Sequence, residues 1–130
     1  MGRGLSDFQL HILFMASDKI LNGRRESKGW MAGRWPDLFI SEILIEFFGW
    51  KPERYHSVLG CHHFSKAAIG EEHYNSIMAT ISRAIRRLNE RGLIQRDRKL
   101  KGIFLTPSGE KTIEQIRVEI VERIQSMRKG

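Results

Sequence analysis

The sequence predicts a mainly α-helical fold with one small β-hairpin, and three observations support this. Apolar residues over 77–88 recur at the spacing of one helix face, and Gly92 follows as a helix terminator. Two short apolar or β-branched runs then enclose a basic, glycine-containing tip within 94–106, which is typical of a hairpin. Helical periodicity also marks 6–21 and 107–128. At 130 residues with 41% apolar content, the chain fits a single domain with a real core.

The positive charge is concentrated in the same unit. Segment 83–101 has eight basic and two acidic residues, a net +6 out of the formal +7 of the whole chain. Such a local field favours a polyanionic partner. A cationic helix followed directly by a cationic hairpin is the plan of a winged helix-turn-helix, with a recognition helix over 71–91 and a wing over 94–106.

The motif SRAIRRLNERGLI, followed by a charged hairpin that closes on LTPSGEK, resembles the winged-helix regulators and in particular the MarR-like group of transcriptional regulators. The resemblance covers about 77–111, roughly a quarter of the chain. It implies that the helix over 75–90 enters the major groove of DNA and that 96–101 of the wing lies along the backbone or minor groove.

Side chains with the chemistry of DNA contacts lie along this unit. Arginine reads guanine and asparagine reads adenine through paired hydrogen bonds, while serine and threonine contact bases or phosphates. The candidate base-reading residues at the front of the helix are Asn75, Ser76, Ala79, Thr80 and Arg83. Arg86 and Arg87 lie further back, where phosphate contacts are expected. The candidate DNA-binding residues of the wing are Arg96, Arg98, Lys99 and Lys101.

The first half of the chain is expected to support this unit. Ser6 and Gln9 have the spacing of a capping box and begin a first helix over 6–21. The loop 22–36 is rich in glycine, basic residues and tryptophan. Its candidate auxiliary phosphate contacts are Arg24, Arg25, Lys28 and Arg34. Trp30 and Trp35 either anchor this loop to the core, which is the favoured interpretation, or stack on an exposed base.

A nearly all-apolar second helix is expected over 37–48, ended by Gly49. The role of 49–70 stays open: 52–59 is interpreted as a helical turn or short helix and 64–69 as another. The recognition helix is then expected to begin near Gly70 or Glu71.

The C-terminal helix over 107–128 begins with a Thr-Pro pair suited to a helix start. Its apolar residues approach the spacing of a coiled-coil seam, and the candidate dimer-interface residues are Ile113, Ile116, Ile120, Ile124 and Met127. Two interpretations remain: the seam packs on the first helix of its own chain, or it contributes to a homodimer interface shared with that helix.

Several classes of function are disfavoured. The single cysteine, Cys61, rules out an internal disulfide and suggests a reducing compartment. No transmembrane span or signal peptide is seen, so a cytoplasmic protein without a membrane partner is expected. The residues that could suggest a metal site are His56, Cys61, His62, His63 and His73. Their spacing matches no zinc pattern, so neither a metal nor another cofactor is expected. No catalytic motif is present, and an enzyme is not expected.

The sequence therefore predicts sequence-specific binding of double-stranded DNA, with transcriptional regulation as the role. One alternative keeps DNA binding in plasmid or phage replication or partition. Another is a winged helix that serves as a protein-interaction module, which the clustered positive charge disfavours because lysine is depleted at the cores of protein interfaces.

Overall fold

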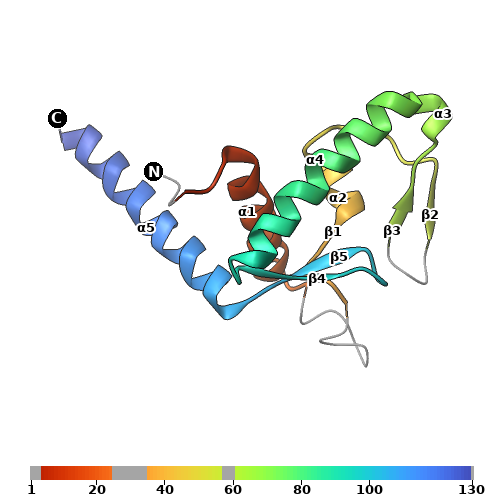
Figure 1. Cartoon of the computed structure of the whole chain (residues 1–130). Helices are drawn as coiled ribbons and strands as arrows, with labels where there is room; N and C mark the ends of the chain where they lie inside the picture. Colours follow the sequence, from red (N-terminus) through yellow and green to blue (C-terminus); the bar gives the residue numbers. More distant parts are fainter. Residues whose placement is uncertain (1–3, 25–34, 57–60, 130) are drawn as a thin grey trace.

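The computed structural model describes residues 4–24, 35–56 and 61–129 (Figure 1). The helices are α1 (Asp7–Leu21), α2 (Ile40–Glu46), α3 (Lys66–Ile69), α4 (Glu71–Glu90) and α5 (Pro107–Lys129). The strands are β1 (Leu38–Phe39), β2 (Arg54–His56), β3 (Cys61–His63), β4 (Ile94–Asp97) and β5 (Gly102–Leu105). The described part is thus mainly helical with little sheet, as the sequence predicts.

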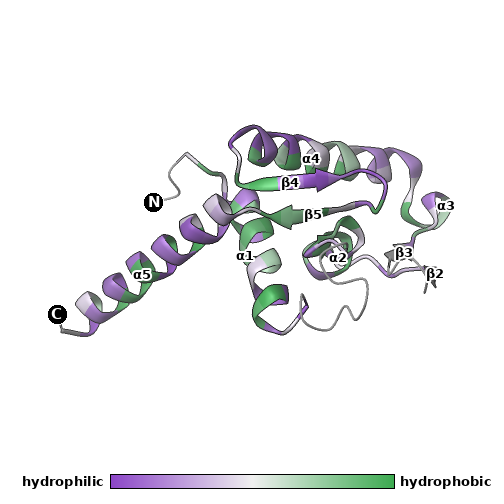
Figure 2. Ribbon diagram, turned by 90° about the horizontal axis from the view of Figure 1, so that it is seen from below, coloured by the Kyte–Doolittle hydropathy of each residue, from purple (hydrophilic) through white to green (hydrophobic). Residues whose placement is uncertain are grey.

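A three-stranded antiparallel sheet lies beside α4, in the order β1-β5-β4. The hairpin expected over 94–106 supplies two of its strands, with Ile94 opposite Leu105 and Asp97 opposite Gly102. Figure 2 shows β5 as largely hydrophobic, whereas β4 is hydrophobic at its start and hydrophilic toward the hairpin tip. The base of the hairpin therefore belongs to the core and its tip to the surface.

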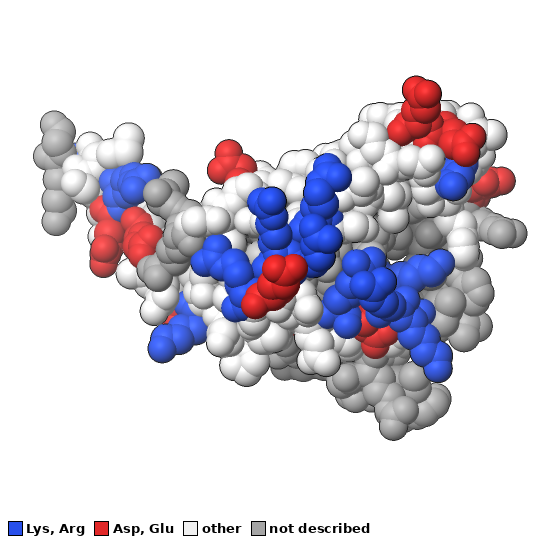
Figure 3. Space-filling model, in the orientation of Figure 1, with Lys and Arg blue, Asp and Glu red and all other residues white. Residues whose placement is uncertain are grey.

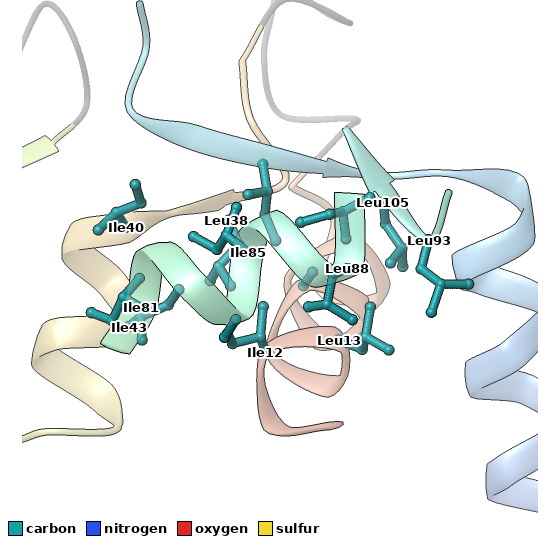
Figure 4. Packing of buried hydrophobic residues seen from close by; sticks show 14 of the residues in the cluster. Ile12, Leu13, Leu38, Ile40, Ile43, Ile81, Ile85, Leu88, Leu93 and Leu105 are labelled. Atoms are coloured by element: carbon teal, nitrogen blue, oxygen red, sulfur yellow. The ribbon is translucent and has the colours of Figure 1, made fainter. Parts of the chain in front are cut away.

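The core forms where α4 packs against α1 and this sheet. Ile81, Ile85 and Leu88 are fully or almost fully buried on one face of α4, between Ile12 of α1 and Leu38 of β1 (Figure 4). Burial of one such side chain contributes roughly 1.5–3 kcal/mol. The buried row that the sequence predicts for this helix is confirmed, so the opposite face of α4 is left for solvent.

The helix starts follow the expected chemistry. The Ser6 hydroxyl accepts a hydrogen bond from the Gln9 backbone N–H (3.1 Å), and the Gln9 side chain accepts one from the Ser6 N–H (2.9 Å), which completes the capping box of α1. At the start of α5, the Thr106 hydroxyl accepts a hydrogen bond from the Gly109 N–H (3.0 Å). Each cap satisfies backbone donors that a helix end otherwise leaves unpaired.

The second helix begins three residues later than the range 37–48 expected for it, and it ends at Glu46. Asp37 is fully buried, and its carboxylate accepts a hydrogen bond from the Leu105 backbone N–H (2.8 Å). Leu38 and Phe39 pair with β5, so their backbone is extended rather than helical. This pairing with a strand more than sixty residues away overrides the local helical pattern.

The interpretation of 52–59 as helical is wrong for the residues that the structure describes. Arg54–His56 is strand β2, which pairs antiparallel with β3. The second short helix expected in this region is confirmed as α3. Gly70, with φ of +101°, separates α3 from α4, and only glycine adopts such a backbone readily.

Helix α5 packs on its own chain through its first half and projects away from the body with its second half (Figure 1). Ile113 and Ile116 are buried, at 2% and 1% exposure, whereas Ile124 and Met127 are 46% and 73% exposed. The expected seam is therefore divided: its first two members pack within the chain and are not free for a second subunit. Ile120 lies between, half-buried.

Candidate nucleic-acid interface

Basic side chains gather on one face of the molecule, over α4 and over the outer part of the β4–β5 hairpin (Figure 3). Between these two elements lies a groove of about 390 Å³. Its lining residues are Ser82, Arg83, Arg86, Asn89, Arg96 and Arg98. We call this feature the arginine groove. Both of its walls contribute arginine, a side chain suited to binding carboxylates and phosphates.

The α4 wall is built by helical periodicity. The row Asn75, Ala79, Ser82 and Arg86 recurs at spacings of four, three and four, so these residues share one face. Because Ser82 and Arg86 line the arginine groove, the whole row follows the same side of α4 as the hairpin.

A second row lies next to the first and consists of Ser76, Thr80, Arg83 and Arg87. The Thr80 hydroxyl donates to the Ser76 carbonyl oxygen (3.0 Å) and accepts from the Arg83 guanidinium (3.3 Å). The structure therefore brings all seven helix residues predicted to contact DNA onto two adjacent rows. The five candidate base-reading residues come before Arg86 in these rows, and the two candidate phosphate contacts, Arg86 and Arg87, come after them.

The hairpin wall is tied to α4 and closed by a tight turn. The Arg96 backbone N–H donates to the Asn89 side-chain oxygen (3.3 Å), which links β4 to α4. At the tip, the Asp97 carboxylate accepts from the Leu100 N–H (2.9 Å), and Lys101 has a positive φ of 55°. These contacts hold the basic tip in one place beside the helix.

The electrostatics of the groove are those of uncompensated positive charge. Burial, and then the neighbouring charge of Arg98, lower the pKa of Arg96 below the ordinary arginine value. Within the described chain, the following cations of this face have no ion-pair partner: Arg83, Arg87, Arg96, Arg98, Lys99 and Lys101. Arg86 pairs only loosely with Glu90, at 3.7 Å between two exposed side chains. An anion bound here would relieve this repulsion.

The candidate contacts of the loop 22–36 have a different environment. Arg24 binds Glu42 through two hydrogen bonds of 3.1 and 2.7 Å and lies over the Phe39 ring, which gives its guanidinium a structural role. Arg25, Lys28, Arg34 and Trp30 lie outside the described residues. The Trp35 ring packs edge-on against the Phe39 ring, with 6.1 Å between the ring centroids, which confirms the anchoring interpretation for this tryptophan.

Sequence reasoning did not single out Ser82 and Asn89 as part of the groove. The signal that could have identified them is helical periodicity, because residues 75, 79, 82, 86 and 89 form one row on a helix. What the sequence does not contain is the side of α4 on which the hairpin folds back, and this decides which row becomes a groove wall.

The histidine cluster offers little for metal binding among the described side chains. No group of three or more histidine, cysteine or acidic side chains is arranged to hold a metal ion in the part of the chain that is described. His73 lies near Trp50, with 6.0 Å between the ring centroids. The side chains of His56, Cys61 and His62 lie outside the description, so the expectation of no metal stays a prediction.

Within the described ranges, no helix is both long enough and apolar enough to span a membrane. Comparisons of the chain with protein-family models, with curated proteins and with solved structures found no match.

Proposed function

We propose that the protein binds double-stranded DNA in a sequence-specific manner and regulates transcription, with α4 as the recognition helix in the major groove and the β4–β5 hairpin as the wing on the backbone. The observation that carries this proposal is the arginine groove, whose two walls present four arginines, of which only Arg86 has an acidic partner among the described residues, the exposed Glu90 at 3.7 Å. A duplex satisfies both walls at once, because the phosphates that border its major groove can contact the arginines while its base edges face α4.

The order of elements supports the same function. From α1 to β5 the chain forms a helix, a short strand, a second helix, the β2–β3 pair, the helices α3 and α4, and the β4–β5 hairpin. The last helix before that hairpin, α4, exposes the candidate base-reading row. Small and polar side chains at Asn75, Ser76 and Ala79 leave room for base edges to approach α4. The arginines further along the helix and on the hairpin suit phosphates.

We further propose that two copies act together through the outer half of α5. Ile124 and Met127 remain exposed there, on the face that continues from buried Ile113 and Ile116. A symmetric pairing of this face would give two recognition helices, as palindromic DNA sites require.

The test separates base reading from phosphate contact. The preferred duplex is first selected from a random pool, and binding of the selected and a scrambled duplex is then compared for Arg83→Ala and Lys99→Ala. We expect Arg83→Ala to lose about 5–150-fold in affinity on the selected duplex alone, which corresponds to about 1–3 kcal/mol of base discrimination. Lys99→Ala should weaken both duplexes equally.

Lys111→Ala is the matched control, because this exposed lysine lies on α5 and does not line the arginine groove. It should leave both affinities unchanged. Equal losses from Arg83→Ala on the selected and scrambled duplexes would refute base reading by α4, and selection of no preferred duplex would refute sequence specificity.

A further inference from the structure

The arginine groove has the size of a small-molecule site as well as the chemistry of a DNA contact. Its volume of about 390 Å³ lies within the range of roughly 300–1,000 Å³ that is usual for such sites. All six of its lining residues are polar or charged, and none is acidic. Four of them are arginines, two from α4 and two from the hairpin: Arg83, Arg86, Arg96 and Arg98. A small ligand that fills this groove therefore carries several negative charges and little apolar surface.

The two hairpin arginines crowd one another beside α4. Burial, as the larger cause, and the charge of Arg98, as the smaller one, lower the pKa of Arg96, so the two guanidinium groups are close enough to repel each other. The Arg96 Nε atom is buried and has no hydrogen-bond partner among the described residues. Buried polar atoms are nearly always paired in folded proteins, and an unpaired one calls for an explanation such as a missing ligand.

The walls of the groove are held in place in the absence of a ligand. The Arg83 guanidinium donates to the Thr80 hydroxyl (3.3 Å), and the Arg96 backbone N–H donates to the Asn89 side-chain oxygen (3.3 Å). The first contact fixes an arginine on the helix, and the second joins the hairpin to the helix. A site whose donors are already positioned loses less conformational entropy when a ligand binds.

We propose that the arginine groove also binds a free chain of two or three linked phosphate groups, either as inorganic polyphosphate or as the phosphate chain of a nucleotide. A single phosphate carries only about 1.5–2 negative charges near neutral pH, so it would leave about half of the four arginine charges unmatched. A chain of phosphates presents oxygens on all sides, so it contacts the arginines of both walls at once. Each guanidinium can donate two parallel hydrogen bonds to phosphate oxygens.

The same lining indicates that the phosphate chain binds without Mg²⁺. Proteins usually hold Mg²⁺ against a triphosphate with one or two carboxylates, and the groove lining contains none. Glu90, which pairs with Arg86 at 3.7 Å, is exposed and lies outside the lining. The four arginines supply the positive charge that the metal otherwise provides. The metal-free triphosphate should therefore bind more tightly than its Mg²⁺ complex, because the complex carries less negative charge.

The test is calorimetric titration of the full chain, without DNA, with inorganic triphosphate and with ATP. Inorganic phosphate and citrate are the control ligands. We expect triphosphate to bind at least about tenfold more tightly than either control, and excess Mg²⁺ at constant ionic strength to weaken its binding. Equal affinities for triphosphate and ATP would assign the ligand to inorganic polyphosphate, whereas tighter binding of ATP would assign it to a nucleotide.

A pair of double variants separates the groove from the basic face around it (Figure 3). Arg86→Gln with Arg98→Gln removes one exposed arginine from each wall and should weaken triphosphate binding about 30-fold or more. Arg87→Gln with Lys99→Gln removes the same charge from the neighbouring positions on the helix and the hairpin tip, which do not line the groove. This control should weaken triphosphate binding at most about threefold at roughly 0.15 M salt, because exposed charges outside the site are screened.

Four outcomes would overturn the proposal. The first is no binding of triphosphate at concentrations up to about 1 mM. The second is binding of phosphate or citrate as tight as that of triphosphate, which would indicate a general anion surface. The third is binding that requires Mg²⁺. The fourth is equal weakening by the two double variants, which would make net charge the cause. A free phosphate chain is a ligand beyond the proposed duplex, and its binding is measured without DNA, so either proposal can fail without the other.

Discussion

The dependence of DNA affinity on salt offers the sharpest test of the arginine groove. Six cations of this face have no acidic partner among the described residues, and each is free to replace a counterion on one phosphate. With about 0.9 counterions released per phosphate, the slope of log affinity against log salt should be about −5.4 for each bound protomer. Affinity should then fall about 1,800-fold between roughly 50 and 200 mM salt.

Removal of two of these charges gives a defined change in that slope. Arg98→Gln with Lys99→Gln neutralises two exposed side chains of the hairpin tip, where neither side chain packs in the core. The slope should fall to about −3.6, and the same salt interval should then cost only about 150-fold in affinity. Fluorescence anisotropy with a labelled duplex, repeated across the salt series, measures both quantities.

The matched control removes the same charge from α5, by Lys111→Gln with Arg128→Gln. It lowers the net charge equally but should leave the slope at its original value. If the control and the hairpin variant flatten the slope by the same amount, the attraction depends on net charge alone, and the reasoning from the arginine groove is refuted.

Three further predictions concern stability and assembly. Gly109→Ala should lower the free energy of unfolding by about 1–3 kcal/mol in urea, because its Cβ would lie 2.1 Å from the Leu93 carbonyl oxygen; an increase, as helix propensity alone predicts, would contradict this. Burial alone would raise the pKa of Glu42, but hydrogen bonds from Arg24 and from a backbone N–H, with nearby positive charge, hold this pKa below its ordinary value of 4.5. Glu42 therefore stabilises the fold above about pH 4.5 and loses this effect as the pH falls through its lower folded pKa. Glu42→Gln should make the melting temperature fall less steeply between neutral and acid pH, and an unchanged pH profile would exclude this role. Ile124→Glu with Met127→Glu should convert a dimer to a monomer in light scattering while leaving the melting temperature of the folded unit nearly unchanged; a monomeric wild type at micromolar concentration would exclude the α5 pairing.

The parts of the fold that the sequence predicts well are those with strong local signals. Helix α4 has a single apolar row and begins after a glycine that the backbone requires, and α1 and α5 begin with capping side chains whose spacing is visible in the sequence. The hairpin is likewise local, because its strands pair with each other across a short tip. Local hydrogen bonds and periodicity are sufficient in all these cases.

The parts that escape prediction depend on distant partners. Leu38 and Phe39 continue an apolar helical pattern, yet they form a strand because β5 offers them an edge and Asp37 binds the Leu105 backbone. The β2–β3 pair similarly joins residues whose sequence shows no alternation of polar and apolar side chains. For the candidate site, the sequence shows which residues are cationic, but only the fold shows that Arg96 lines both the arginine groove and a second cavity, between α2 and the first half of α4.

The junction between α4, the hairpin and α5 bears on the spacing of half-sites in the DNA that we propose the protein to bind. The Thr106 hydroxyl donates to the Gly92 carbonyl oxygen (2.6 Å) while it caps α5, and the backbone of Gly109 lies so close to Leu93 that a methyl group does not fit between them. The direction of α5 is thereby fixed relative to α4. In a dimer paired through α5, this junction sets the separation and the rotational phase of the two α4 helices. Because the major groove returns to the same side of a duplex only about every 34 Å, such a dimer would tolerate few spacings between its two half-sites.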